Sequence, residues 1–146
     1  MNPGSPVTDL VFRAMRSDPN GQPVCGQDRR TLGVKPGAAP EGDIPIDSAG
    51  NVLPANGGMS IAPGDPLHLP KHRRPRELGG EGRDAVFQLP TAALYPALAL
   101  RLDRPEHGLI EPSEPCRFIA FQNAPHATQP DWILYGGPSA PDTTPS

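Results

Sequence analysis

Proline constrains the fold of this chain more than any other residue, because 22 of the 146 residues are proline and they are spread along the sequence. A proline has no backbone N–H donor and disrupts the interior of a helix or a central strand. Together with 16 glycines, this predicts short regular elements joined by long connections and excludes a helical bundle. The hydrophobic residues, 36% of the chain, fall in separate runs, so we expect an ordered, loop-rich fold rather than disorder.

The size and net charge of the chain limit its class. A length of 146 residues fits one domain with a single core. The net charge of −3 argues against nonspecific nucleic-acid binding, which depends on neutralising many phosphates together. Any positively charged site must therefore be local.

Cysteine usage and the N-terminal sequence bear on cofactors and localisation. Cys25 and Cys116 lie far apart and form no CxxC pair, and His68 and His126 lack partners at ligand spacing, so no metal site is expected. Reduced, structural thiols fit this pattern. The first residues lack the basic and apolar regions of a signal peptide, and no apolar run is long enough to span a bilayer. We expect synthesis as a soluble cytoplasmic protein that does not bind membranes; export without a signal peptide into a target cell remains open.

Short apolar runs separated by turn residues predict an α+β fold. Strands are expected at 7–15, at 44–46 and 51–53 as a hairpin, around Ser60, at 85–89 and at 108–110. Short helices are expected at 92–98, capped by Thr91, and from Pro115 to Phe121, with a last apolar run at 132–135. Residues 1–8 are expected to be a flexible lead, 9–135 the single domain and 136–146 a disordered tail.

A glycine pair, a serine and a basic cluster mark the candidate site. Gly57 and Gly58 precede Ser60, and a proline-paced loop then leads to a cluster at 71–76 that contains three arginines, a lysine and a histidine. The glycines allow close backbone approach to a ligand, and the serine hydroxyl can face a cleft beside phosphate-sized positive charge. The alternative interpretation is a turn that enters an edge strand, followed by a solvated basic loop.

Several short motifs recur here in the order known from one toxin family. They are Phe12-Arg13-Ala14, Asp43-Ile44, Gly57-Gly58-Met59-Ser60, Val86-Phe87, Leu98, Asp103, and His107 followed by Ile110 and Pro112. On these residues, over about 9–121 of this sequence, the chain resembles the ADP-ribosyltransferase-like toxins typified by the second effector of a bacterial type VI secretion system. The resemblance implies a compact fold in which two small, bent β-sheets open a cleft for NAD.

The resemblance also implies roles for individual residues. Arg13 matches a first-strand arginine that contacts NAD, and Ser60 matches a middle-strand serine that orders the nicotinamide half. An arginine fork suits a diphosphate, and a carboxylate near the ribose stabilises the oxocarbenium character of the transition state. Glu106 and Glu111 flank the late strand, and we take Glu111 as the catalytic carboxylate.

Three more side chains complete the predicted site. His107 is a catalytic candidate that contacts the ribose, and Arg73 and Arg74 are candidates for covering the NAD phosphates. Each has an ordinary alternative: Arg13 can pair with a surface aspartate, His107 can be a structural histidine, and the basic run can simply be solvated. The sequence lacks a Glu-x-Glu or Gln-x-Glu pair, so transfer to a target and hydrolysis of NAD both stay open.

The predicted function is that of an NAD-dependent toxin with ADP-ribosyltransferase-like or NAD glycohydrolase activity that poisons the cell. NAD is its substrate and no metal is expected. A cognate immunity protein or antitoxin is the expected partner, while the acceptor stays undefined. The alternative is a non-catalytic module of the same fold that keeps the cleft and binds a protein. A toxin that acts on translation or RNA through the basic cluster is a third hypothesis.

Overall fold

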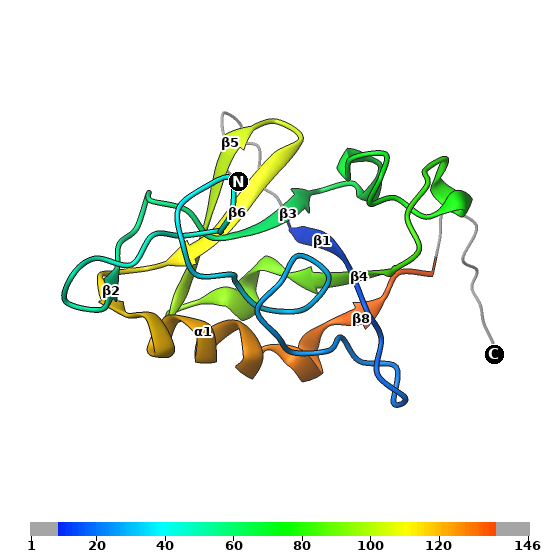
Figure 1. The fold of residues 1–146 in the computed structure, drawn as a ribbon. Helices are drawn as coiled ribbons and strands as arrows, with labels where there is room; N and C mark the ends of the chain where they lie inside the picture. Colours follow the sequence, from blue (N-terminus) through cyan, green and yellow to red (C-terminus); the bar gives the residue numbers. More distant parts are fainter. Residues whose placement is uncertain (1–8, 137–146) are drawn as a thin grey trace, which may run out of the picture.

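The computed structural model describes residues 9–136, which form a mixed α+β fold with two antiparallel sheets and one α-helix (Figure 1). The larger sheet has six strands in the order β5-β6-β3-β1-β4-β8, and the smaller pairs β2 with β7. Their bounds are β1 Leu10–Met15, β2 Asn51–Val52, β3 Met59–Pro63, β4 Ala85–Pro90, β5 Leu98–Arg104, β6 His107–Pro112, β7 Cys116–Arg117 and β8 Ile133–Leu134. The predicted lead at 1–8 and the predicted tail beyond residue 136 lie outside the described residues.

Within the large sheet, β1 is paired most extensively with β4. All six residues of β1 have a partner on β4, from Leu10 opposite Pro90 to Met15 opposite Ala85. Both segments are rich in branched and aromatic residues, which suit a pleated, buried surface. Phe87 and Leu89 are fully buried in the main core. The strand expected at 85–89 is confirmed, and the strand expected at 7–15 is present over Leu10–Met15; residues 7 and 8 lie outside the described residues.

The other side of β1 is paired much more briefly. β1 and β3 share only two partner pairs, Val11 with Pro63 and Phe12 with Ala62. The remaining residues of β3 pair with β6 instead, with Ser60 opposite Leu109. The large sheet therefore opens between the second half of β1 and the first half of β3.

The helix expected at 92–98 is wrong. A 3₁₀ turn, η3, covers Thr91–Leu94, and Leu98 begins β5. Pro96 disfavours a helical conformation at Tyr95, which is extended at φ −87° and ψ 150°. The alternation of leucine with other residues at Leu98, Leu100 and Leu102 was a strand signal that the prediction missed.

The expected hairpin between 44–46 and 51–53 is also wrong. β2 pairs with β7, so Val52 lies opposite Cys116 rather than a residue of the 44–46 segment. Only the turn between the segments is as expected, with the Asp47 side chain accepting from the amides of Ala49 and Asn51. The partner strand lies more than 60 positions away, which local turn chemistry does not reveal.

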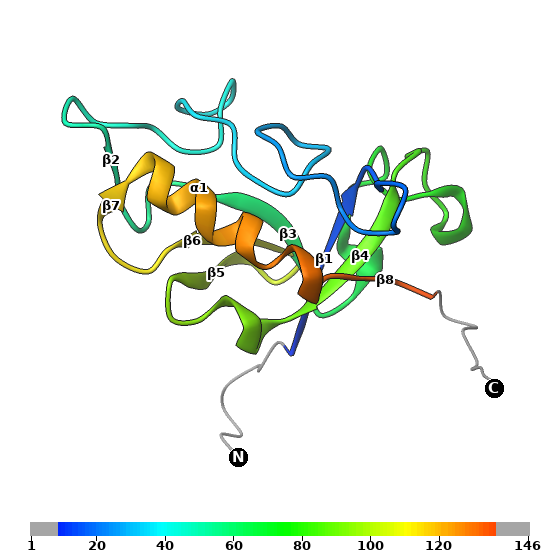
Figure 2. The same ribbon diagram turned by 90° about the horizontal axis from the view of Figure 1, so that it is seen from below.

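Helix α1, Phe118–Ala127, lies along one face of the large sheet (Figure 2). It begins three residues later than expected, because Cys116 and Arg117 form β7. The buried amide of Gln122 accepts from the Val34 amide at 2.9 Å and donates to the Val34 carbonyl at 2.8 Å. These bonds tie the long segment between β1 and β2 to the helix. No helix among residues 9–136 has the length and apolarity needed to cross a membrane.

The proline-paced segment between β3 and β4 contains two 3₁₀ turns, η1 at Pro66–His68 and η2 at Arg76–Leu78. Asp65 caps η1 through a bond from the Leu67 amide. Leu69 packs with Phe12 in a small second hydrophobic cluster, on the face of β1 opposite the main core. This segment, residues 64–84, is called the lid below. It forms one side of the opening in the sheet.

Candidate functional site

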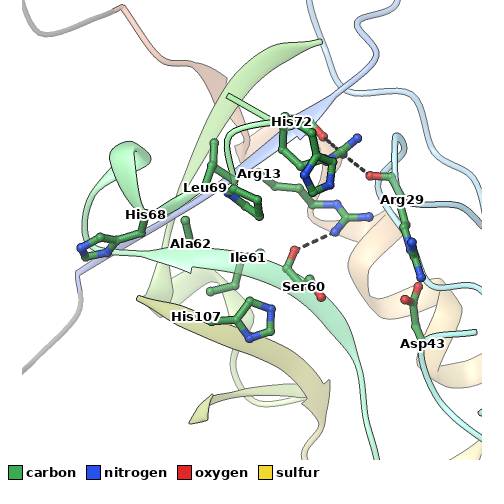
Figure 3. Close-up of a pocket in the computed structure, with 13 residues that line it drawn as sticks. Arg13, Arg29, Asp43, Ser60, Ile61, Ala62, His68, Leu69, His72 and His107 are labelled. Carbon is green, nitrogen blue, oxygen red and sulfur yellow. Dashed lines mark hydrogen bonds between the residues drawn. The ribbon is translucent and has the colours of Figure 1, made fainter. Parts of the chain in front are cut away.

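A cavity of about 200 Å³ lies where β1 and β3 separate, between the lid, β6 and the loop before β2 (Figure 3). Four of the residues predicted from the sequence line it: Arg13, Ser60, Arg73 and His107. They come from β1, β3, the lid and β6, respectively. Side chains as far apart in sequence as residues 13 and 107 therefore share one cavity.

Arg13 lies under the floor of the cavity and is 4% exposed. Its Nη1 donates to the Ser60 carbonyl at 2.7 Å, and its Nε and Nη2 donate to the Thr31 carbonyl at 3.1 and 2.8 Å. Burial lowers the pKa of the guanidinium to about 10, while the nearby Asp43 carboxylate acts to raise it. Arg13 stays charged at neutral pH and replaces the backbone bonds that β1 and β3 do not make.

Ser60 is the exposed position of β3, between the buried residues Met59 and Ile61. Its carbonyl is held by Arg13, while its hydroxyl makes no hydrogen bond to the described residues. The alternation of a strand turns this side chain away from the core and into the cavity (Figure 3). The result is a fixed backbone that carries an available donor and acceptor group.

Arg73 connects the lid to the rest of the cavity wall. Its Nη2 donates to the Ala14 carbonyl at 2.7 Å and also to the Arg29 carbonyl. Its Nη1 lies 3.7 Å from Asp84 Oδ2, and Asp84 is in turn held by a two-bond contact with Arg30 at 2.8 and 2.7 Å. Burial lowers the pKa of Arg73, and the hydrogen bond from Arg30 lowers the pKa of Asp84. Both groups remain charged near neutral pH.

His107 begins β6 and is 24% exposed at its side chain. Its Nδ1 lies 2.7 Å from Asp103 Oδ1, across the hairpin from β5. The register that pairs Ser60 with Leu109 places His107 on the same sheet face as Ser60. A histidine and a serine hydroxyl thus flank the cavity from neighbouring strands.

Two predicted site residues lie outside this cavity. Glu111 Oε1 accepts from the Ala55 amide at 2.9 Å and from Arg101 Nε at 2.8 Å. Ala55 has the positive φ of 70° that disfavours a non-glycine residue, so Glu111 stabilises a costly turn. Arg74 donates from Nη1 to the Leu67 carbonyl at 3.2 Å within the lid. The structure gives both side chains a local structural contact.

Two residues that were not singled out as site residues, Arg29 and Asp43, also line the cavity. Both residues also line an adjoining hollow of about 290 Å³, together with Asn56 and Ser60. Asp43 Oδ2 accepts from the Lys35 amide at 2.8 Å, and Arg29 Nη2 donates to the Pro40 carbonyl at 2.7 Å. The motif Asp43-Ile44 was a signal for one of them. Nothing local in the sequence distinguishes Arg29 from its neighbour Arg30.

The glycine pair before Ser60 serves backbone packing as well as the site. A Cβ on Gly57 would lie 2.2 Å from the Asp43 carbonyl oxygen, and one on Gly58 would lie 2.3 Å from the Ile110 carbonyl oxygen. Gly57 also has a φ of +140°, a region that favours glycine. Both glycines line the adjoining hollow, but what approaches them closely is the backbone of the protein itself.

The side chains that line the cavity suit a ligand that carries negative charge and hydroxyl groups. Arg29 and Arg73 supply positive charge, Ser60 supplies a hydroxyl, and Ile61 and Leu69 supply apolar surface. Within residues 9–136, no three His, Cys, Asp or Glu side chains are grouped to hold a metal ion. No family model matches the chain, and no curated protein is significantly similar to it. The site itself therefore carries the argument about function.

Proposed function

We propose that this cavity binds NAD and that the protein is a toxin of the ADP-ribosyltransferase-like class, which either transfers ADP-ribose or hydrolyses the dinucleotide. The observation that carries the proposal is the exposed hydroxyl of Ser60, a residue whose backbone carbonyl is held by buried Arg13 at the opening between β1 and β3. The proposal includes the finer fold assignment, in which the two halves of the opened sheet act as the two bent sheets around an NAD cleft.

Charge and polarity around Ser60 support this choice of substrate. A dinucleotide combines a diphosphate, hydroxyl-rich riboses and flat apolar rings. Arg29 can bind the diphosphate, and Arg73, whose donors face Ala14, Arg29 and Asp84, adds positive charge beside it. His107 and the Ser60 hydroxyl can bind ribose hydroxyls. Cleavage of the bond to nicotinamide gives positive charge on the ribose ring, which a nearby carboxylate stabilises. Asp43, rather than Glu111, is the carboxylate that lines the cavity.

Arg13 has a different role in this proposal from the one expected for it. Its donors are directed at backbone carbonyls of Ser60 and Thr31. It therefore fixes the strand that carries Ser60 and adds positive potential beneath the ligand, rather than forming a fork around a phosphate. Arg74, bonded within the lid, is given no contact with NAD.

A toxic activity requires protection of the cell that makes the protein, so we also propose a cognate immunity protein or antitoxin that covers the cavity. The proline-rich lid beside the cavity has few conformations to lose on binding, which favours such a contact. The toxin is proposed to be made in the cytoplasm and then either kept there or exported without a signal peptide.

The first experiment compares inducible expression of the wild type with Ser60→Ala, while cell growth, total NAD and released nicotinamide are followed. We expect growth arrest and NAD loss with the wild type and neither with Ser60→Ala, because the hydroxyl is removed without a buried contact. Ser48→Ala is the matched control, since Ser48 is an exposed serine outside the cavity. Normal growth and unchanged NAD with folded wild-type protein contradict the proposal.

One observation favours a second candidate function. Glu111, the expected late carboxylate, is occupied by Ala55 and Arg101, which is compatible with a cleft that binds without catalysis. In that case the protein is a binding module for a protein partner. NAD would stay intact in expressing cells, and Ser60→Ala would leave partner binding nearly unchanged.

A further inference from the structure

The hairpin between β5 and β6 contains an irregularity beside the cavity. The regular register ends at Leu102 opposite Gly108, and the next pair is Arg104 opposite His107, so Asp103 is the extra residue of a β-bulge. A bulge changes the direction of a side chain and is frequent next to active sites. Here the Asp103 carboxylate accepts from His107 Nδ1 at 2.7 Å.

This hydrogen bond determines the tautomer of His107. An ionised carboxylate only accepts, so Nδ1 must carry the proton, and neutral His107 then has its lone pair on Nε2. Burial acts to raise the pKa of Asp103, but the hydrogen bond and charge of His107 together lower it below its ordinary value. Asp103 is therefore ionised at neutral pH.

His107 is also close to the proposed reaction centre. Because Ser60 is opposite Leu109, His107 is a diagonal neighbour of Ser60, at a Cβ separation of about 7 Å typical of such pairs. Figure 3 shows the His107 ring on the side of the cavity where Ser60 lies, while His68 lies beyond Ala62.

The other groups in the cavity are less suited to accept a proton. Asp43 already accepts from the Lys35 amide, and His68 Nδ1 is directed at the Pro63 carbonyl at the far end. His72 is exposed and has no carboxylate partner within residues 9–136. Among the described side chains, His107 alone combines a carboxylate partner with a place beside Ser60.

We propose that Asp103 is a positioning residue that holds His107 as the general base for an O–H nucleophile at the NAD ribose. This inference rests on the proposed function. The nucleophile is either water or a hydroxyl group of an acceptor; the two share the same chemistry and differ in the product.

The proposed step is balanced without a further reactant. The bond between ribose C1′ and the nicotinamide nitrogen breaks, and its electron pair neutralises the pyridinium, so that nicotinamide leaves uncharged. The oxygen of the nucleophile forms a bond to C1′ of the ribose, and the proton of that oxygen passes to His107 Nε2. The products are nicotinamide and either ADP-ribose or an ADP-ribosylated acceptor.

The kinetic test measures nicotinamide release from NAD by purified wild type, His107→Ala, Asp103→Asn and Glu106→Gln. We expect kcat to fall about 100-fold in His107→Ala and about 10-fold in Asp103→Asn, with little change in KM, because proton transfer acts in the transition state. Added imidazole should restore part of the His107→Ala rate. Glu106→Gln, which removes a carboxylate charge from the same hairpin, should behave as wild type.

The outcomes separate this inference from the proposed function. If the wild type releases nicotinamide and His107→Ala has an unchanged kcat, or is not rescued by imidazole, His107 is not the general base. The proposed toxin function then still stands. Absence of release from the wild type overturns both. Free ADP-ribose as the product identifies water as the nucleophile. ADP-ribose attached to an added macromolecule identifies a hydroxyl group of that acceptor as the nucleophile.

A second measurement does not depend on activity. In the wild type, proton–nitrogen correlation spectra of the neutral His107 ring should show the proton on Nδ1 and the lone pair on Nε2. Asp103→Asn should change this pattern, and Glu106→Gln should not. Protonation at Nε2 instead of Nδ1 in the wild type contradicts the inference.

Discussion

The two sides of β1 differ in how they are held. Toward β4, the backbone ladder extends over all six residues from Leu10 to Met15. Toward β3, the ladder covers only Val11 and Phe12. Beyond them, the Arg13 side chain connects the two strands by its hydrogen bond to the Ser60 carbonyl. One strand thus forms a continuous sheet on one side and the floor of a cavity on the other.

This difference shows how a small domain can keep its core and still expose a polar group between two strands of its sheet. Phe87 on β4 is fully buried, whereas Ser60 on β3 is exposed. A backbone ladder brings neighbouring strands to a fixed spacing and leaves no space between them. Replacing ladder bonds by a long side chain keeps the strands connected while they diverge.

The largest expected effect is on the β4 side. Phe87→Ala should lower the free energy of unfolding by about 4 kcal/mol, because it removes a large side chain from the core and leaves a cavity. Chemical denaturation monitored by circular dichroism measures this. Phe118→Ala, at a partly buried position packed against the same core, is the comparison and should cost less. An equal or smaller loss for Phe87→Ala would show that the β4 side is not the more tightly packed one.

A somewhat smaller effect is expected on the β3 side. Arg13→Met should lower the free energy of unfolding by about 2–3 kcal/mol, since it keeps the stem but removes the donors to the part-buried Ser60 carbonyl and the buried Thr31 carbonyl. The same denaturation experiment measures the loss. Arg16→Met, at an exposed arginine next to the end of β1, should change it little. Wild-type stability of Arg13→Met would mean that the guanidinium does not connect the two strands.

The smallest effect is expected from the ion pairs behind the lid. Asp84→Asn should cost about 1 kcal/mol at pH 7, because Arg30 is half exposed and the pair is screened by solvent. The pKa of Asp84 is lowered in the folded state, so its contribution is present above the ordinary aspartate pKa of about 4 and is lost as the pH falls through the lowered value. The difference between Asp84→Asn and wild type should therefore shrink in acid. A difference that grows in acid contradicts this assignment.

The sequence predicted those elements whose signal is local. The segment 85–89, closed by Pro90, and the apolar run at 7–15 identified β4 and β1, and the site residues Arg13, Ser60, Arg73 and His107 do share a cavity. The partner of β2 was not predictable in this way, since pairing with β7 depends on residues far along the chain. β5 was missed because the capping residue Thr91 favoured a helix over the strand alternation that follows.

The contacts of single side chains were the least predictable part. Arg13 and Glu111 were expected to face a ligand, yet both are held by backbone groups of the protein. Sequence identifies which residues carry charge, but not which carbonyl or amide lies within 3 Å of them. The same is true of Asp103, whose contact with His107 depends on a bulge.

The sequence by itself determined that this chain has short elements, long loops and a core built from a few apolar runs, because proline and glycine act on the backbone where they stand. Only the tertiary structure decided that β1 and β3 separate after two pairs and that Arg13 fills the gap. The free energy of such an arrangement comes from contacts between segments distant in sequence, and no local pattern records which segments those are.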